Sequence, residues 1–321
     1  MRDNYKYLTT HARHDPAICQ TAGLFRSIPK RKITNFQSFT LVYTFKKGFV
    51  NFDILKPLGA FDLRVFQGIV AMCGPDGYNL SCHPKTLEGK FLRKALGLET
   101  ENESDLDNSD ISVGWEKRDT LMIRFKPCRL LAEIAMADNG QNIGRLKSSL
   151  LTMGKIPIHV HCDGDEFTGQ LMSCFIPKTE KKERWAVAVN PFMAAAILGS
   201  RPHIRINMEE VRSLRSDPGR LIHQRLCSFI NIGESKWLTA KVLTTYVWPE
   251  GSVSPSTERT RMEIVRKALR ELIFLGWTVK ETGKDKYLIG RPPCKNRYNA
   301  DKTRYNADKT RYITDATITE N

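Results

Sequence analysis

The amino-acid sequence predicts an α+β protein with two successive domains that share one order of helices and strands. The chain has 321 residues, more than a single hydrophobic core usually organises. Hydrophobic periodicity predicts helix, strand, helix, helix and β-hairpin over residues 199–291, and a weaker form of this order over residues 57–198. We expect two domains there, preceded by an N-terminal extension with a small β-hairpin (residues 1–56) and followed by a tail (residues 292–321).

The charge of the chain indicates a negatively charged partner. It contains 50 Lys and Arg against 35 Asp and Glu, a formal net charge of +15. Residues 199–291 hold 17 of these basic residues and 10 of the acidic ones, so 7 of the 15 net charges lie in the second domain. Because such an excess favours association with phosphate backbones, we expect the chain to bind nucleic acid.

Several classes of protein are disfavoured by the sequence. No apolar run reaches the roughly 18 residues of a membrane span and the N-terminus is polar, so we expect a cytoplasmic protein without membrane contact. The eight cysteines form no CxxC pair, and the common phosphate-binding and hydrolytic motifs are missing. We therefore expect no enzyme activity, no catalytic residues, no metal and no cofactor.

The N-terminal extension and the start of the first domain have clear local patterns. Residues 39–45 and 49–54 alternate around a turn, which predicts a β-hairpin. Apolar residues spaced three and four apart over residues 61–73 predict a helix with one buried face. The Gly-Pro-Asp-Gly sequence at 74–77 is expected to end this helix.

Two segments lack the apolar residues that a packed core needs. Residues 99–110 carry six carboxylates, which predicts a solvated acidic insertion in the first domain. Residues 297–303 are repeated at 304–310 and, imperfectly, at 311–317. Because these repeats are mostly polar, we expect the tail to be disordered.

The second domain gives the stronger pattern. Asp217 and Pro218 are expected to begin a first helix, residues 237–238 a short strand, and Thr239 to cap a second helix that ends at residues 248–251. The residues expected to face inward are Leu221, Ile222, Leu226, Phe229 and Ile230 in the first helix and Val242, Leu243, Tyr246 and Val247 in the second.

A third helix is expected from residues 254–256 to Leu275, with Gly276 as its C-terminal cap and a β-hairpin at residues 277–289. Its buried stripe consists of Met262, Val265, Leu269 and Leu272, and its other face carries Arg259, Arg261, Arg266, Lys267 and Arg270. Helix, strand, helix, helix and hairpin is the order of a winged-helix domain. Such a domain places its third helix in a DNA major groove about 12 Å wide, with the hairpin beside it.

The first domain repeats this order more weakly. Its expected elements are helices at residues 61–73, 127–136 and 142–153, a strand at 156–162, a turn at 163–165 and a returning strand at 170–176. Ile143, Leu146, Leu150 and Met153 form the expected buried face of the last helix. The sequence therefore predicts two tandem winged-helix domains.

The candidate DNA contacts lie in the two third helices, in the second hairpin and in the second helix of the second domain. Side chains near the N-terminus of such a helix normally reach base edges, whereas other basic residues bind phosphates. The candidates for base contact are Ser256, Thr257, Arg259, Thr260 and Arg261. The candidates for phosphate contact are Arg266, Lys241, Lys280, Lys284 and Lys286. The first domain adds Asn142, Arg145 and Lys147 as DNA-binding candidates.

A basic amphipathic helix is often no more than a solvated surface. Here, however, a helix cap and a hairpin accompany it, and the same order of elements recurs in the first domain. We expect the second domain to make most of the sequence-specific contacts. The first domain is expected to grip the adjacent groove or to associate with a second copy of the chain in a homodimer.

His159 and His161 offer a competing interpretation. Two histidines that flank one apolar residue on a strand also mark the metal site of rolling-circle nicking enzymes, in which a tyrosine attacks DNA. Tyr246 and the tail tyrosines Tyr298, Tyr305 and Tyr312 could serve as nucleophile, but the sequence shows no third metal ligand. We favour the simpler interpretation, in which both histidines lie on the outer face of a hairpin strand.

The sequence also resembles the RepC replication initiators of IncQ-type plasmids over roughly residues 11–292. The resemblance is carried by His14-Asp-Pro16, Gly23-Leu-Phe-Arg26, Pro57-Leu-Gly-Ala60, Asp62-Leu-Arg64, Gln67-Gly68, Asn190-Pro191, Met208-Glu-Glu-Val-Arg212, Arg220-Leu-Ile-His-Gln-Arg-Leu-Cys227, Tyr246-Val-Trp-Pro249, Val265-Arg-Lys-Ala-Leu269 and Leu275-Gly-Trp-Thr-Val279. It does not extend to the acidic segment after Leu98 or to the repeated tail.

This resemblance implies a non-enzymatic initiator that binds repeated origin sites (iterons) in double-stranded DNA, promotes opening of the origin, and helps to load a plasmid-encoded helicase and primase. The absence of an ATP-binding motif agrees with a separate unwinding motor. A winged-helix transcriptional repressor is the alternative of a different class. The two differ in whether the protein opens duplex DNA or only occupies a promoter.

Overall fold

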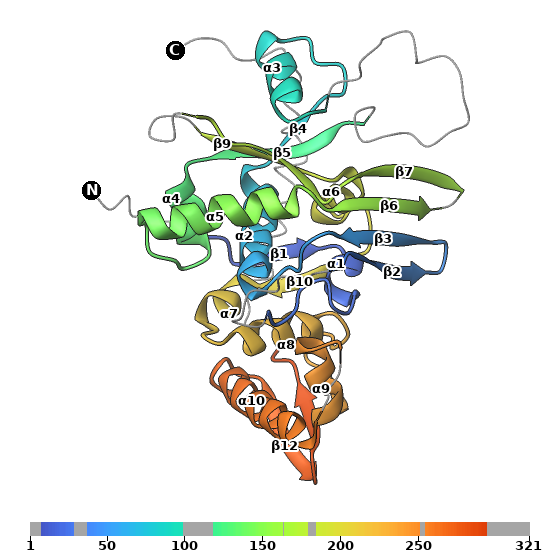
Figure 1. Ribbon diagram of the computed structural model, residues 1–321, viewed down its shortest axis with the longest axis vertical. Helices are drawn as coiled ribbons and strands as arrows, with labels where there is room; N and C mark the ends of the chain where they lie inside the picture. The colour runs from blue at the N-terminus through green and yellow to red at the C-terminus, as the bar shows by residue number, and fades with distance from the viewer. Residues whose placement is uncertain are drawn as a thin grey trace.

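The computed structural model describes residues 8–28, 37–98, 118–162, 164–178, 184–250 and 254–293. It shows an elongated molecule in which small antiparallel sheets and helices alternate, and residues 208–290 form its lower end (Figure 1). This is the mixed α+β class that the sequence predicts. Among the described residues, no helix has the length and apolar character needed to cross a membrane.

Two four-stranded antiparallel sheets build the upper part of the molecule. One has the order β2-β3-β6-β7 and consists of β2 (Phe39–Phe45), β3 (Gly48–Ile54), β6 (Pro157–Cys162) and β7 (Asp165–Gln170). The other has the order β4-β5-β9-β8 and consists of β4 (Tyr78–Leu80), β5 (Thr120–Phe125), β8 (Met172–Phe175) and β9 (Trp185–Val189). The first sheet therefore joins two hairpins that lie about a hundred residues apart in the sequence.

Helix α2 (Ala60–Asp76) is the centre of the upper part and is buried on nearly all sides. The expectation of a single buried face is wrong for this helix, because helices and strands surround it. Gly68 permits the close approach of α4, since a Cβ atom there would lie 2.5 Å from Cγ2 of Ile134. The other helices of this part are α3 (Leu87–Ala95), α4 (Pro127–Glu133), α5 (Gly140–Met153) and α6 (Pro191–Leu198).

The lower end contains the helix, strand, helix, helix and hairpin order that the sequence predicts. Its elements are α7 (Met208–Ser213), α8 (Asp217–Cys227), β11 (Ser235–Thr239), α9 (Ala240–Val247), α10 (Pro255–Phe274), β12 (Thr278–Gly283) and β13 (Lys286–Gly290). The three strands pair antiparallel in the order β11-β13-β12, and α10 packs against α8 and α9. Gly276, with φ of +89°, turns the chain from α10 into β12.

The N-terminal segment ties the two ends of the molecule together. Strand β1 (His11–His14) pairs with β10 (Ile204–Asn207), and helix α1 (Pro16–Gln20) follows it. The side-chain amide of Gln224 in α8 donates to the backbone oxygen of Ile18 at 3.3 Å. The larger of two buried apolar clusters among the described residues runs from the upper part into the lower end.

Three details differ from the sequence-based expectations. The hairpin at residues 39–54 forms, but it is not a separate extension. Its strand β3 pairs with β6, so the hairpin is part of a sheet of the first domain. The strand that returns from β6 is β7 and not residues 170–176, because the chain leaves this sheet at Leu171 and enters the other as β8. Val242 does not face inward: it is 39% exposed on α9, where Ala240 is buried instead.

The acidic insertion at residues 99–110 and residues 294–321 of the repeated tail lie outside the described residues.

Candidate nucleic-acid interface

Helix α10 presents a polar outward face that includes three basic residues. Ser254 caps the helix by accepting a hydrogen bond from the backbone N–H of Thr257 at 3.2 Å. Val265, Ala268, Leu269 and Leu272 are buried against the rest of the lower end. At 100° per residue, the opposite face consists of Ser256, Arg259, Thr260, Glu263, Lys267 and Arg270, and all six residues are exposed.

The five candidates for base contact do not all lie on this outward face. Ser256, Arg259 and Thr260 do. Arg261 lies on the inner side of the helix instead, with its guanidinium 5.1 Å from the ring centre of Trp248. The hydroxyl of Thr257 is 2.8 Å from that of Ser254 and therefore takes part in the helix cap. Arg261 and Thr257 therefore do not point outward with the other three candidates.

The hairpin formed by β12 and β13 lies beside the helix and is fixed to it. Arg266 contacts Asp285 in the hairpin turn, with Nη2 and Oδ1 2.7 Å apart. Asp285 has φ of +60°, the left-handed conformation that a tight turn needs. Arg266 was expected to contact phosphate, but in the structure its guanidinium holds the hairpin turn against α10.

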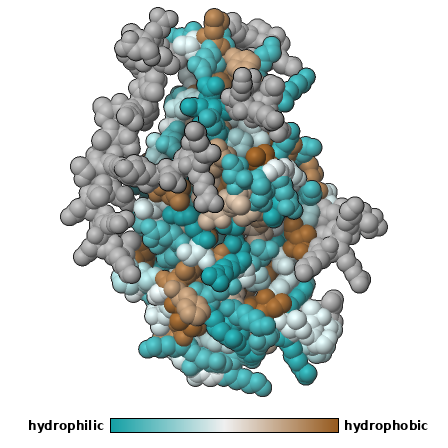
Figure 2. Space-filling model, turned by 90° about the vertical axis from the view of Figure 1, so that its left-hand side faces the viewer, coloured by the Kyte–Doolittle hydropathy of each residue, from teal (hydrophilic) through white to brown (hydrophobic). Residues whose placement is uncertain are grey.

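The remaining basic candidates of the lower end are accessible. Lys280, Lys284 and Lys286 are exposed along the hairpin, and Lys241 is exposed in the first turn of α9. Figure 2 shows the left-hand side of the molecule, where the surface of the lower end is mostly hydrophilic. The lower end thus combines a polar helix face with a basic hairpin.

A buried polar network holds the base of the hairpin against α7 and α8. The carboxylate of Glu210 lies 2.7 Å from Nε2 of His223 and accepts a hydrogen bond from the indole N–H of Trp277 at 2.9 Å. Burial opposes a charge on His223, but contacts with Cys227 and Glu210 outweigh it and raise the pKa of His223 to about 10. The pair is therefore ionised near neutral pH.

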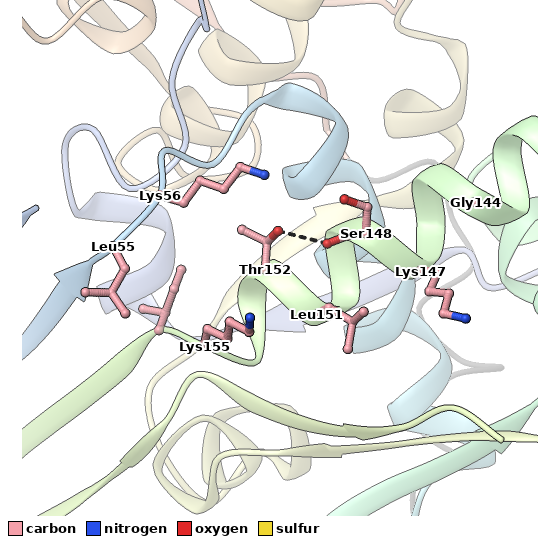
Figure 3. Close-up of a pocket in the computed structure, with 9 residues that line it drawn as sticks. Leu55, Lys56, Gly144, Lys147, Ser148, Leu151, Thr152 and Lys155 are labelled. Atoms are coloured by element: carbon pink, nitrogen blue, oxygen red, sulfur yellow. Dashed lines mark hydrogen bonds between the residues drawn. The ribbon is translucent and has the colours of Figure 1, made fainter. Parts of the chain in front are cut away.

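The upper part carries a second basic surface on α5. A groove of about 440 Å³ runs between this helix and the connection from β3 to α2 (Figure 3). Lys56, Lys147 and Lys155 line it together with the half-exposed side chains of Leu55 and Leu151. Sequence reasoning identified Lys147 but missed Lys56 and Lys155, which the folded chain brings to the same groove.

Short side chains form the wall of this groove along α5. Gly144, Ser148 and Thr152 follow one another at intervals of four residues, and the hydroxyl of Thr152 donates to the backbone oxygen of Ser148 at 2.8 Å. A Cβ atom on Gly144 would meet no other atom within 4 Å. A ligand could therefore approach the backbone of α5 closely here.

The other two candidates on α5 have internal contacts. Asn142 is only 9% exposed, and its side-chain amide donates to the backbone oxygen of Ala137 at 2.8 Å. It therefore stabilises the start of α5 and is not available to DNA. Arg145 is exposed, with its guanidinium 4.2 Å from the ring centre of Phe61.

His159 and His161 lie on the outer face of β6, and the structure adds a neighbour that the sequence did not reveal. Glu166 in β7 places its carboxylate 3.2 Å from Nδ1 of His161 and 3.7 Å from Nε2 of His159. Among the described residues, no group of three or more potential ligands is arranged to hold a metal ion. Tyr246 belongs to α9 at the lower end, whereas the tail tyrosines lie outside the described residues.

Comparisons with solved structures find distant similarity to RctB. A crystal structure of domains 2 and 3 of RctB, as its selenomethionine derivative, has a TM-score of 0.46 and 9% identity, covering 85% of this chain and 97% of that one. A second structure, of RctB domains 2–3 (residues 155–483), also has a TM-score of 0.46 and 9% identity, covering 86% and 95%. No curated protein sequence matches the chain significantly.

The comparison with protein-family models gives the decisive result. The model described as Replication protein C (RepC) matches residues 6–293, which include all the elements of the two basic surfaces. This match confirms the resemblance that the sequence showed. The chain belongs to the replication protein C (RepC) family.

Proposed function

We propose that this protein initiates plasmid replication by binding repeated origin sites (iterons) in double-stranded DNA through two winged-helix domains. One observation carries the proposal: α10 presents a polar face with three basic residues and is fixed by the Arg266–Asp285 ion pair to a hairpin with three exposed lysines. The element order and the β11-β13-β12 sheet of the lower end support a winged helix over residues 199–291.

In this proposal α10 enters the major groove and the hairpin follows the adjacent backbone. Ser256, Arg259 and Thr260 lie in the first two turns of the helix, where side chains normally reach base edges. Lys280, Lys284, Lys286 and Lys241 neutralise phosphates, which supplies affinity for any sequence. Arg266 acts by setting the distance between the helix and the hairpin.

The upper part supplies the second DNA contact. Its order of α2, α4, α5 and the β6–β7 hairpin supports a first winged-helix domain over residues 57–198, extended by the β2–β3 hairpin. Lys56, Lys147 and Lys155 bind phosphates around the α5 groove, and the short side chains of Gly144 and Ser148 let the DNA backbone approach. The same surface could instead pair two copies of the chain.

We infer the remaining steps of initiation, and membership of the RepC family supports them. The bound protein distorts and opens the origin without hydrolysing a nucleotide, and a plasmid-encoded helicase and primase then load on the opened strands. The protein is therefore an origin-binding factor and not an enzyme. A transcriptional repressor with the same domains would bind its site without opening it.

The test uses supercoiled plasmid DNA that carries the protein's own origin, with permanganate to detect unpaired thymines. We expect saturable binding to the origin fragment, at least about 1,000-fold tighter than to random duplex at physiological salt, and permanganate reactivity that depends on the protein. Tight binding without new reactivity would support the repressor. Equal affinity for both DNAs would contradict the proposal.

A further inference from the structure

Glu263 occupies the middle of the DNA-facing side of α10, where an acidic residue is unexpected. Its side chain is 48% exposed, and it shares the outward face with Arg259, Lys267 and Arg270. The other acidic residues of this helix lie elsewhere. Glu258 is in the first turn, on the side of Met262, and Glu271 accepts hydrogen bonds from the backbone N–H groups of residues 215 and 216.

Two arginines lie near the carboxylate of Glu263. Nη1 of Arg266 lies 3.5 Å from one carboxylate oxygen, and Nη2 of Arg270 lies 3.8 Å from the other. Arg266 is itself anchored to Asp285 in the hairpin turn. The carboxylate therefore lies beside the arginine that joins the helix to the hairpin, on the face of α10 that points outward.

A carboxylate on this face has few favourable partners in DNA. It repels the phosphates and the acceptor atoms N7 and O6 of guanine and O4 of thymine. The hydrogen-bond donors on the major-groove edge are the amino groups N6 of adenine and N4 of cytosine. Adenine presents its N7 acceptor directly beside N6, so an ionised carboxylate fits cytosine better.

We propose that Glu263 selects a cytosine within the binding site by accepting a hydrogen bond from its N4 amino group. This inference rests on the proposed function, because it requires α10 to enter the major groove. Glu263 contributes specificity at the expense of general affinity, since its charge opposes every phosphate nearby.

The experiment measures binding of the full chain to the footprinted origin site and to duplexes that change each base pair in turn. For the unmodified protein, one C·G pair near the centre of the α10 contact should be required, with a loss of about 5- to 150-fold on replacement. E263A should bind all pairs at that position within about 2-fold. It should also bind random duplex more tightly and with a steeper salt dependence.

The substitution E263Q gives the sharper result, because a glutamine amide can both donate and accept. It should move the preference at this position from cytosine to adenine, to which glutamine bonds through N6 and N7. The matched control is E281Q, which removes one exposed carboxylate from the hairpin and should leave the base preferences unchanged. Melting curves of each variant establish that it is folded, as expected for exposed side chains.

The outcomes separate the two proposals. If the unmodified protein prefers no sequence, the proposed function itself fails. If it prefers the origin site and R259A weakens that preference, but E263A and E263Q keep the base preferences of the unmodified protein at every position, then the proposed function stands and the role of Glu263 is refuted.

Discussion

The α10 surface and the α5 surface follow the same local order of helix and hairpin but differ in how they are built. The α10 face carries long charged side chains, and its hairpin forms part of a small three-stranded sheet. The α5 face carries Gly144, Ser148 and Thr152, and its hairpin is built into a four-stranded sheet with β2 and β3. The comparison teaches that one order of elements can present long charged side chains at one end and short side chains that leave the helix backbone accessible at the other.

The largest expected effect concerns the network that holds the lower end together. Glu210→Ala would leave the buried, protonated His223 without its carboxylate, so the free energy of unfolding should fall by about 3–5 kcal/mol. Urea denaturation followed by circular dichroism measures this. The exposed neighbour Glu209→Ala is the control, and equal losses for both variants would show that the network does not anchor the lower end.

The next largest effect is expected from substitutions that test which side chains of α10 point outward. Arg259→Ala should cost about 1–3 kcal/mol of binding to the origin site and much less on random DNA. Arg261→Ala, two residues away, removes a guanidinium that stacks on Trp248 and should lower thermal stability slightly while sparing specificity. Fluorescence anisotropy with both duplexes measures the difference. A larger loss of specificity from Arg261→Ala would reverse our assignment of the outward face.

A third effect concerns β1, which connects the two ends. Burial lowers the pKa of His14 to about 3, and neither of its ring nitrogens has a hydrogen-bond partner among the described residues. In the unfolded chain this histidine binds a proton near pH 6.5, so acidification between pH 6.5 and 3 favours unfolding by about 1.4 kcal/mol per pH unit. The stability from this group is therefore present above pH 6.5 and is lost as the pH falls.

The variant His14→Leu should not show this loss. Relative to the unmodified protein, its free energy of unfolding should rise by about 2 kcal/mol between pH 6.5 and pH 5. Taking the difference between the two proteins removes the opposite contribution of Asp15, whose pKa burial raises to about 6. Parallel stability curves for the two proteins over this range would contradict the prediction.

The smallest effect tests the α5 surface. Lys155→Ala should weaken binding to origin and random DNA alike, and should reduce the slope of log affinity against log salt concentration by about 1. Lys90→Ala, which removes an exposed lysine from α3 at the far end of the molecule, should change neither quantity (Figure 1). A change in base preference with Lys155→Ala would mean that α5 also reads sequence.

Sequence patterns predicted the lower end well because its signals are local. Ser254, Thr239 and Gly276 are helix caps, which depend only on residues of the helix that they begin or end. The spacing of Val265, Leu269 and Leu272 indicates which side of α10 is buried. The same geometry of 100° per residue places Arg261 on the inner side. The candidates for base contact were selected by their distance from the N-terminus of the helix alone, which left this direction out of account.

The upper part was predicted less well because its organisation depends on distant contacts. Alternation over residues 165–175 cannot reveal that the chain changes sheets at Leu171, since both strands obey the same period. The burial of α2 on all sides and the meeting of Lys56 with Lys155 depend on segments far apart in the sequence. The carboxylate of Glu166 between two histidines is a further example.

The central claim is that the two basic surfaces bind repeated sites in one origin, with α10 reading the sequence. Hydroxyl-radical footprinting of the full chain on its own origin DNA tests this most directly. We predict protection of each repeat on both strands, lost at all repeats with Arg259→Ala and retained with Arg261→Ala. Uniform protection of origin and flanking DNA, unchanged by Arg259→Ala, would contradict the account.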